Sequence, residues 1–279
     1  MYLSYLEGAI LGLVQGLAEF LPISSSGHLA ALQYFFGVDA ERVLFFSIML
    51  HVGTLVSLLA VYYKDIGALI WEFICTIKDI CTGKGPRINS SEHRRLMFLI
   101  IVATIPTGII GLLFSDTFDK MYQSLLPIGI FLLVTGALLW LAERVKTGRK
   151  TEKNAKWRNA IMVGIFQGLA ICPGLSRSGT TMTGGLLAGL SRPFAVRFAF
   201  LISLPSILGA AILEVPDAIE AGVDPSIVGP MVVGMIIAAV SGFFAIKTMI
   251  RVVSNKKLHY FSYYVWIVGA FLIIWHLTH

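Results

Sequence analysis

The sequence predicts an all-α polytopic membrane protein whose two halves form an inverted-topology repeat. Three observations lead to this fold class: the composition, the pattern of long apolar segments, and a motif that occurs twice. Of the 279 residues, 56% are hydrophobic and 14% are charged, and the mean hydropathy is +0.80. Soluble domains carry about a quarter charged residues. So little charge cannot cover a water-facing surface, so soluble, secreted and disordered chains are excluded.

Six apolar segments are long enough, or nearly so, to cross a hydrocarbon core of about 30 Å, which takes about 20 helical residues. They are residues 43–63, 96–114, 125–142, 194–213, 226–246 and 260–277. We predict a transmembrane helix for each. Residues 66–81, which follow the first span, are amphipathic, and we expect them to lie along the inner membrane interface.

Two further apolar stretches, 3–36 and 159–190, are interrupted in their middle by FLPISSSGH and CPGLSRSGTT. Most of their halves are too short to cross the membrane alone. Interrupted helices are tolerated at membrane depth only where protein or water satisfies the freed backbone groups. We therefore predict two re-entrant helical hairpins.

The charges indicate the direction of each span. Sixteen of the 22 Lys and Arg residues fall in the stretches 78–95, 143–158 and 247–257, as cytoplasmic loops do under the positive-inside rule. The segments 115–120 and 214–224 carry acidic residues and are predicted to be outer loops. This alternation with apolar runs explains the net charge of +6 as a topology signal and argues against a nucleic-acid partner.

An internal repeat relates the two hairpins. Residues 12–29 match residues 164–181 without gaps at 8 of 18 positions, including the shared elements Q-G-L-A and S-x-S-G. Three spans follow each copy, and because three is odd the second half is inverted. We predict one integral-membrane domain, 1–279, made of a repeat 1–142, a basic cytoplasmic loop 143–158 and a repeat 159–279. Such repeats place a binding site near the midplane.

Each hairpin loop is predicted to bind an anion. Ser- and Gly-rich turns that lead into a helix present free N–H groups at its positive end. Arg177 lies inside the second loop, and a guanidinium at membrane depth needs an anionic partner, for which its planar fork suits phosphate. The alternative is a pair of structural breaks lined with capping serines.

The first hairpin carries the groups that could perform chemistry. Gln15 and Glu19 are four residues apart and share one helical face. Serines and a histidine follow in the loop and the next half-helix: Ser24, Ser25, Ser26 and His28. Together with Arg177 they form a set suited to phosphoryl transfer, although a lone Glu or His can also be a satisfied packing residue. His51 in the next span either lines this site or makes a structural hydrogen bond.

At these residues the chain resembles a known family. VQGLAEFLPISSSGH resembles the [E/Q]-x-x-x-E and P-x-S-S-x-G-H motifs of the bacterial undecaprenyl-diphosphate phosphatase family of the bacitracin-resistance type, and PGLSRSGTT resembles its P-G-x-S-R-S-x-x-T motif. The resemblance implies hydrolysis of undecaprenyl diphosphate to undecaprenyl phosphate and phosphate. That reaction recycles the carrier lipid for peptidoglycan synthesis and confers bacitracin resistance. It also implies the bacterial cytoplasmic (inner) membrane, with the active site facing the outer side.

The resemblance also implies roles for residues. The implied catalytic residues are Glu19, Ser25, His28 and Arg177. The implied substrate-binding residues are Gln15, Ser24, Ser26, Gly27, Ser176, Ser178 and Thr181. The family uses a divalent cation. Because Gln15 stands where the family often has Glu, Glu19 is the single acidic metal ligand, which favours one Mg²⁺ or Ca²⁺ bridging Glu19 and the diphosphate.

Several points stay open in the sequence. The nucleophile is Ser25, His28 or an activated water, with a Ser25-centred site favoured. The rival function is a transporter or flippase for a polyisoprenyl phosphate or other anion, because inverted repeats are transporter architecture. The expected partners are the lipid substrate and the bilayer. A homodimer is compatible with the sequence.

Overall fold

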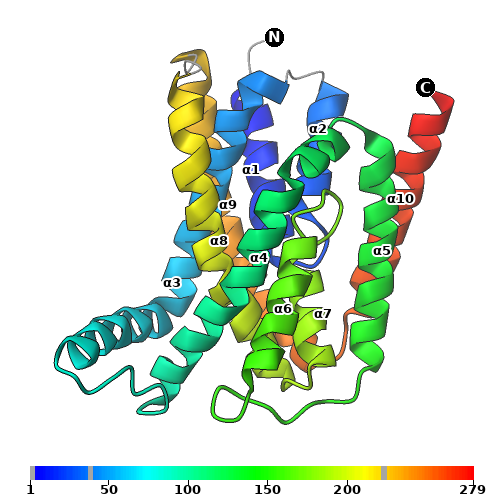
Figure 1. Ribbon diagram of the computed structural model, residues 1–279. Helices are drawn as coiled ribbons and strands as arrows, with labels where there is room; N and C mark the ends of the chain where they lie inside the picture. The colour runs from blue at the N-terminus through cyan, green and yellow to red at the C-terminus, as the bar shows by residue number, and fades with distance from the viewer. Residues whose placement is uncertain (1–3, 37–39, 221–224) are drawn as a thin grey trace.

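The computed structural model describes residues 4–36, 40–220 and 225–279, and within them every regular element is a helix apart from one bridge between Lys150 and Leu190. In chain order the helices are α1 (Tyr5–Phe20), α2 (Ser25–Phe36), α3 (Ala40–Cys81), α4 (Glu92–Tyr122), α5 (Leu125–Arg144), α6 (Trp157–Leu169), α7 (Arg177–Leu187), α8 (Arg192–Glu220), α9 (Pro225–Ser254) and α10 (His259–Thr278). Figure 1 shows them as one bundle with both chain ends on the same side.

Among the residues that the structure describes, six helices are long and apolar enough to cross a membrane: α3, α4, α5, α8, α9 and α10. Each coincides with one of the six predicted spans, so that prediction is confirmed and the chain is a multi-pass membrane protein. The other four helices are only 11 to 16 residues long. They form two successive pairs, α1–α2 and α6–α7, each joined by one of the predicted Pro/Gly/Ser loops.

Helix α3 bends at Tyr62, whose φ of −105° and ψ of 21° depart from helical values. Beyond the bend the helix runs out to the side of the bundle (Figure 1). One face of this arm exposes large apolar side chains, such as Ile70 and Trp71. On another face Glu72 and Asp79 bind the Arg94 guanidinium at 2.8 and 2.7 Å. The predicted division between a span and an amphipathic segment at 66–81 is therefore present as a bend within one helix.

Two segments predicted to be outer loops are helical. Residues 115–120 continue α4, which ends at Tyr122, and residues 214–220 continue α8; residues 221–224 lie outside the described part. The prediction of loops at these residues is therefore wrong, because acidic side chains do not end a helix and a helix that leaves the hydrocarbon layer can continue in water.

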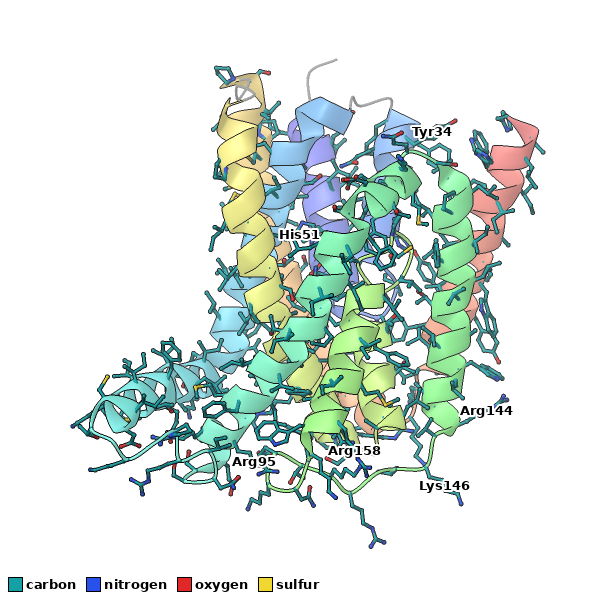
Figure 2. The ribbon with its side chains drawn as sticks, viewed as in Figure 1. Tyr34, His51, Arg95, Arg144, Lys146 and Arg158 are labelled. Atoms are coloured by element: carbon teal, nitrogen blue, oxygen red, sulfur yellow. The ribbon has the colours of Figure 1, made fainter. Side chains whose placement is uncertain are left out.

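Basic side chains gather at one end of the bundle. Figure 2 shows Arg95, Arg144, Lys146 and Arg158 there, with Tyr34 at the opposite end and His51 between them, nearer to Tyr34. The uneven distribution of basic residues along the sequence therefore corresponds to one basic end of the folded bundle.

The packing partners are exchanged between the two halves. Helix α1 packs on α9, its counterpart α6 packs on α4, and α5 packs on α10. Repeat-equivalent glycines allow the close contacts: a Cβ on Gly12 would overlap the carbonyl oxygen of Gly234, and one on Gly164 would overlap that of Ala103. These two glycines, which are equivalent in the sequence repeat, therefore have the same packing role in both copies.

Candidate active site

Helix α1 brings two polar side chains into the interior on one face. Gln15 is fully buried and Glu19 is 6% exposed, and the Gln15 Nε2 donates to Glu19 Oε2 at 3.0 Å. The helix ends at Phe20 and Pro22 follows, a residue that disfavours continuation because it lacks an N–H. Glu19 therefore sits in the last turn of α1, directly before the loop.

The first loop turns through Ser24, which adopts a left-handed φ of 70°. Its Oγ accepts from the Gly27 N–H at 3.2 Å and lies 3.3 Å from Ser26 Oγ. This capping arrangement begins α2 and turns the next residue back towards α1. As a result the Ser25 hydroxyl donates to Glu19 Oε2 at 2.7 Å.

The second loop repeats these hydroxyl contacts, although Ser176 has an extended φ of −72° where Ser24 is left-handed. Ser176 Oγ accepts from the Gly179 N–H at 3.2 Å and lies 3.3 Å from Ser178 Oγ. The two loops touch, because the Ser178 hydroxyl donates to the carbonyl oxygen of Leu21 at 3.3 Å. A Cβ on Gly27 would in turn lie 3.3 Å from the Cα of Gly174. The two S-x-S-G loops thus meet in the interior as similar structures.

Arg177 joins the two loops electrostatically. It is the first residue of α7, and its Nη2 lies 2.7 Å from Glu19 Oε1. The Glu19 side chain is 3% exposed and that of Arg177 is 25% exposed. One Glu19 oxygen therefore faces the guanidinium, while the other accepts from Ser25 and Gln15. The sequence predicted that Gln15, Glu19, Ser25 and Arg177 act together, and the structure brings them into contact.

His28 takes a different position from the one that a base for Ser25 would need. Its Nδ1 lies 2.8 Å from the carbonyl oxygen of Ser24, and its Nε2 lies 2.9 Å from the hydroxyl of Tyr264. Both ring nitrogens are therefore occupied by groups other than Glu19 and Ser25.

His51 is the histidine that faces Glu19. Its Nε2 lies 3.7 Å from Glu19 Oε2, while its Nδ1 donates to the Ser47 carbonyl oxygen at 2.9 Å. The sequence left a site role and a structural hydrogen bond open for His51; the structure gives it both contacts. Its position within a span, a few turns after the first hairpin, was the only signal.

Thr181, predicted to bind substrate, is 1% exposed. In the described part of the chain its hydroxyl has no hydrogen-bond partner, nor does the Gln15 Oε1 oxygen. Buried polar atoms without partners are uncommon. With the Thr180 hydroxyl, three such atoms lie on the helices that carry Glu19 and Arg177, and they leave hydrogen-bonding capacity unused there.

The described residues contain no group of three or more His, Cys, Asp or Glu side chains able to hold a metal ion by themselves. Glu19 and His51 offer one oxygen and one nitrogen. Mg²⁺ sites often use one or two carboxylates and take their other ligands from substrate phosphates and water. The donor set therefore fits a cation that arrives with a phosphate substrate.

Fold and site together define a polytopic membrane protein with a buried carboxylate, hydroxyl and guanidinium where two helix-start loops meet. The family described as "Bacitracin resistance protein BacA" matches residues 8–271. A protein of Alkaliphilus metalliredigens named undecaprenyl-diphosphatase is 52% identical over 271 residues, which are 97% of this chain and 98% of the relative. One of the same name from Carboxydothermus hydrogenoformans is 45% identical over 273 residues, 96% of each chain. This chain belongs to the BacA family.

Proposed function

We propose that this protein hydrolyses undecaprenyl diphosphate to undecaprenyl phosphate and inorganic phosphate, recycling the carrier lipid for peptidoglycan synthesis and conferring bacitracin resistance. Its family membership and the names of its full-length relatives support this activity. The observation that carries the proposal is the contact of the Ser25 hydroxyl with Glu19, whose other oxygen meets Arg177.

In the proposed mechanism the diphosphate binds where the two loops meet. Its oxygens compete with Glu19 for the Arg177 guanidinium and accept from loop N–H groups and from the hydroxyls of Ser176 and Ser178. Thr181, whose hydroxyl lacks a partner, would join them after a small movement. Phosphoryl transfer depends mainly on such positioning and charge stabilisation.

The proposed nucleophile is Ser25. Its Oγ attacks the terminal phosphorus, Glu19 takes the hydroxyl proton, and the anhydride P–O bond breaks to release undecaprenyl phosphate. Water then hydrolyses the phosphoserine, which releases phosphate and restores the serine. Glu19 is favoured over His28 as the base because it already accepts from Ser25 at 2.7 Å, within the reach that proton transfer requires.

We propose that the reaction uses one Mg²⁺ or Ca²⁺. Glu19 and His51 would hold it together with the diphosphate. When bound, the cation would neutralise charge on the phosphate oxygens. The neutral Gln15, hydrogen-bonded to Glu19, would orient that carboxylate.

The inverted repeat, the re-entrant nature of the α1–α2 and α6–α7 pairs, and the outward orientation also belong to the proposal. The exchanged packing of α1 on α9 and α6 on α4 supports the repeat. The gathering of basic residues at the end away from His51 supports a site open to the outer side of the cytoplasmic membrane (Figure 2). A second copy of the chain is not required, since the described site groups come from one chain.

The deciding experiment measures phosphate release from a polyisoprenyl diphosphate by the purified protein in detergent, beside Glu19→Ala and Ser25→Ala. Detergent abolishes compartments, so transport alone gives no signal. Release that both variants lose would support the proposal. If folded wild-type protein with metal supplied releases no phosphate, the rival flippase or anion-transporter function, which the repeat architecture favours, takes its place.

A further inference from the structure

Tyr264 holds the imidazole of His28 from a helix 236 residues away in the chain. Its hydroxyl lies 2.9 Å from His28 Nε2, and the two rings stack with centroids 5.6 Å apart and an interplanar angle of 10°. Tyr264 lies on α10, whereas His28 lies in the first turn of α2. The sequence alone gives Tyr264 only the role of an aromatic residue at the membrane interface.

The two hydrogen bonds of His28 fix its proton. A carbonyl oxygen can only accept, so the Nδ1 that meets the Ser24 carbonyl carries a hydrogen. In the neutral ring Nε2 is then an acceptor, and the Tyr264 hydroxyl donates to it. If the ring gains a second proton, the same hydroxyl oxygen can accept from it. The Ser24 carbonyl therefore sets the tautomer of His28, and Tyr264 fixes the orientation of the ring in either protonation state.

His28 in turn supports the turn that presents Ser25. The Ser24 carbonyl accepts from the His28 backbone N–H at 3.2 Å as well as from its ring at 2.8 Å. Ser24 has a left-handed φ of 70°, a conformation that is unfavourable for residues with a Cβ and persists where its surroundings support it. A series of contacts therefore leads from Tyr264 through His28 and Ser24 to the residue that meets Glu19.

The second loop contains no such support. Thr180 occupies the position equivalent to His28, and its hydroxyl is buried without a partner in the described part of the chain. The position equivalent to Ser25 is Arg177, whose long side chain reaches Glu19 by itself. Of the two loops, the first therefore has the aromatic contact. Its Ser25 side chain is short, so the position of its hydroxyl depends on the backbone of that loop.

We infer that Tyr264 is a positioning residue for the hydrolysis, which fixes His28 and through it the Ser25 loop. This inference rests on the proposed function. The hydroxyl makes the hydrogen bond to Nε2 and the ring makes the stacking contact, so removing the hydroxyl alone tests the hydrogen bond. The expected result is a lower kcat with KM little changed, because the protein's contacts with the diphosphate are retained.

The test compares Tyr264→Phe, His28→Ala and the double variant in detergent, with Tyr263→Phe as the matched control. Tyr263 packs on Trp140 and Trp266. We expect kcat to fall about tenfold or more in Tyr264→Phe, with an unchanged Tm. The double variant should be no slower than His28→Ala, since residues that act as one unit are not additive. Tyr263→Phe should match wild type.

Two results would overturn the inference while leaving the proposed function intact: wild-type kcat in Tyr264→Phe, or losses in the two single variants that multiply in the double variant. An inactive wild-type protein would instead reject the hydrolysis itself. A fall in the Tm of Tyr264→Phe equal to that of a Tyr264→Leu variant would assign the residue to packing alone, and would also overturn the inference.

Discussion

The Glu19 carboxylate and the Arg177 guanidinium form an ion pair of 2.7 Å, although the two residues belong to different halves of the chain. Glu19 lies in the last turn of α1 and Arg177 is the first residue of α7, so the pair forms only when the two loops meet. Within it the buried carboxylate has its counter-charge, and the less buried guanidinium can reach an arriving anion. The pair therefore links the two loops, and in the proposed function its guanidinium meets the phosphate.

Replacement of Arg177 should remove most turnover. In Arg177→Ala the phosphate loses its guanidinium and Glu19 becomes a buried charge without its counter-charge, which is strongly unfavourable. Arg177→Lys should recover little, because an ammonium cannot offer the planar fork that two phosphate oxygens require. Phosphate release in detergent measures this, with Arg149→Ala in an exposed loop as control. Turnover near wild type in Arg177→Ala would refute the anion-site assignment.

Ser25→Ala should lower kcat by about 100-fold or more if its hydroxyl attacks phosphorus. Rapid quenching of wild-type protein with a terminally labelled substrate should then trap label on Ser25. Ser26→Ala should lose less, because among the described residues the Ser26 hydroxyl contacts only Ser24. Equal losses in both variants without trapped label would favour direct attack by water.

The features of this site that depend on local sequence could be predicted. The contacts that depend on long-range packing could not. The prolines and glycines of FLPISSSGH and CPGLSRSGTT predicted both breaks, because they interrupt helices for local steric reasons. The four-residue spacing of Gln15 and Glu19 predicted that they share one helical face, because residues four apart are neighbours on a helix surface. The partners of His28 and His51 depend instead on how α10 and α3 rotate against the hairpins. Hydropathy does not fix that rotation. The sequence therefore indicates only an interface role for Tyr264, and it leaves both a site role and a structural hydrogen bond open for His51.

His51→Ala should weaken the response to divalent cation. Its Nε2 faces Glu19 Oε2 at 3.7 Å, so it can share a cation with that carboxylate. We expect the metal concentration for half-maximal activity to rise several-fold, and Mn²⁺ binding followed by electron paramagnetic resonance to weaken in parallel. His93→Ala is the control, since His93 lies next to Asp65 at the basic end of the bundle. Unchanged Mn²⁺ binding would limit His51 to a structural role.

Removal of divalent cations should stop hydrolysis reversibly. Glu19 is the one carboxylate in the site, so most of the cation's ligands must come from substrate and water. Such a site exchanges freely with solution, and excess chelator should abolish phosphate release within the mixing time. Added Mg²⁺ or Ca²⁺ should restore it. Full activity in excess chelator would remove the cation from the proposed mechanism.

Gly164→Ala should destabilise the protein, because the added methyl group would overlap the Ala103 carbonyl oxygen where α6 crosses α4. Overpacking of this kind costs about 1–3 kcal/mol, and Tm in detergent should fall. Gly108→Ala is the matched control on α4: no heavy atom lies within 4 Å of its added Cβ. It should be neutral or stabilising, since alanine is favoured over glycine inside a helix by about 0.5–1 kcal/mol.

If the two variants have the same Tm, the close approach of α6 to α4 does not limit stability. If the Tm of Gly164→Ala falls while that of Gly108→Ala does not, and the Tm of Gly12→Ala falls as well through its contact with Gly234, the two repeat-equivalent glycines share one packing role.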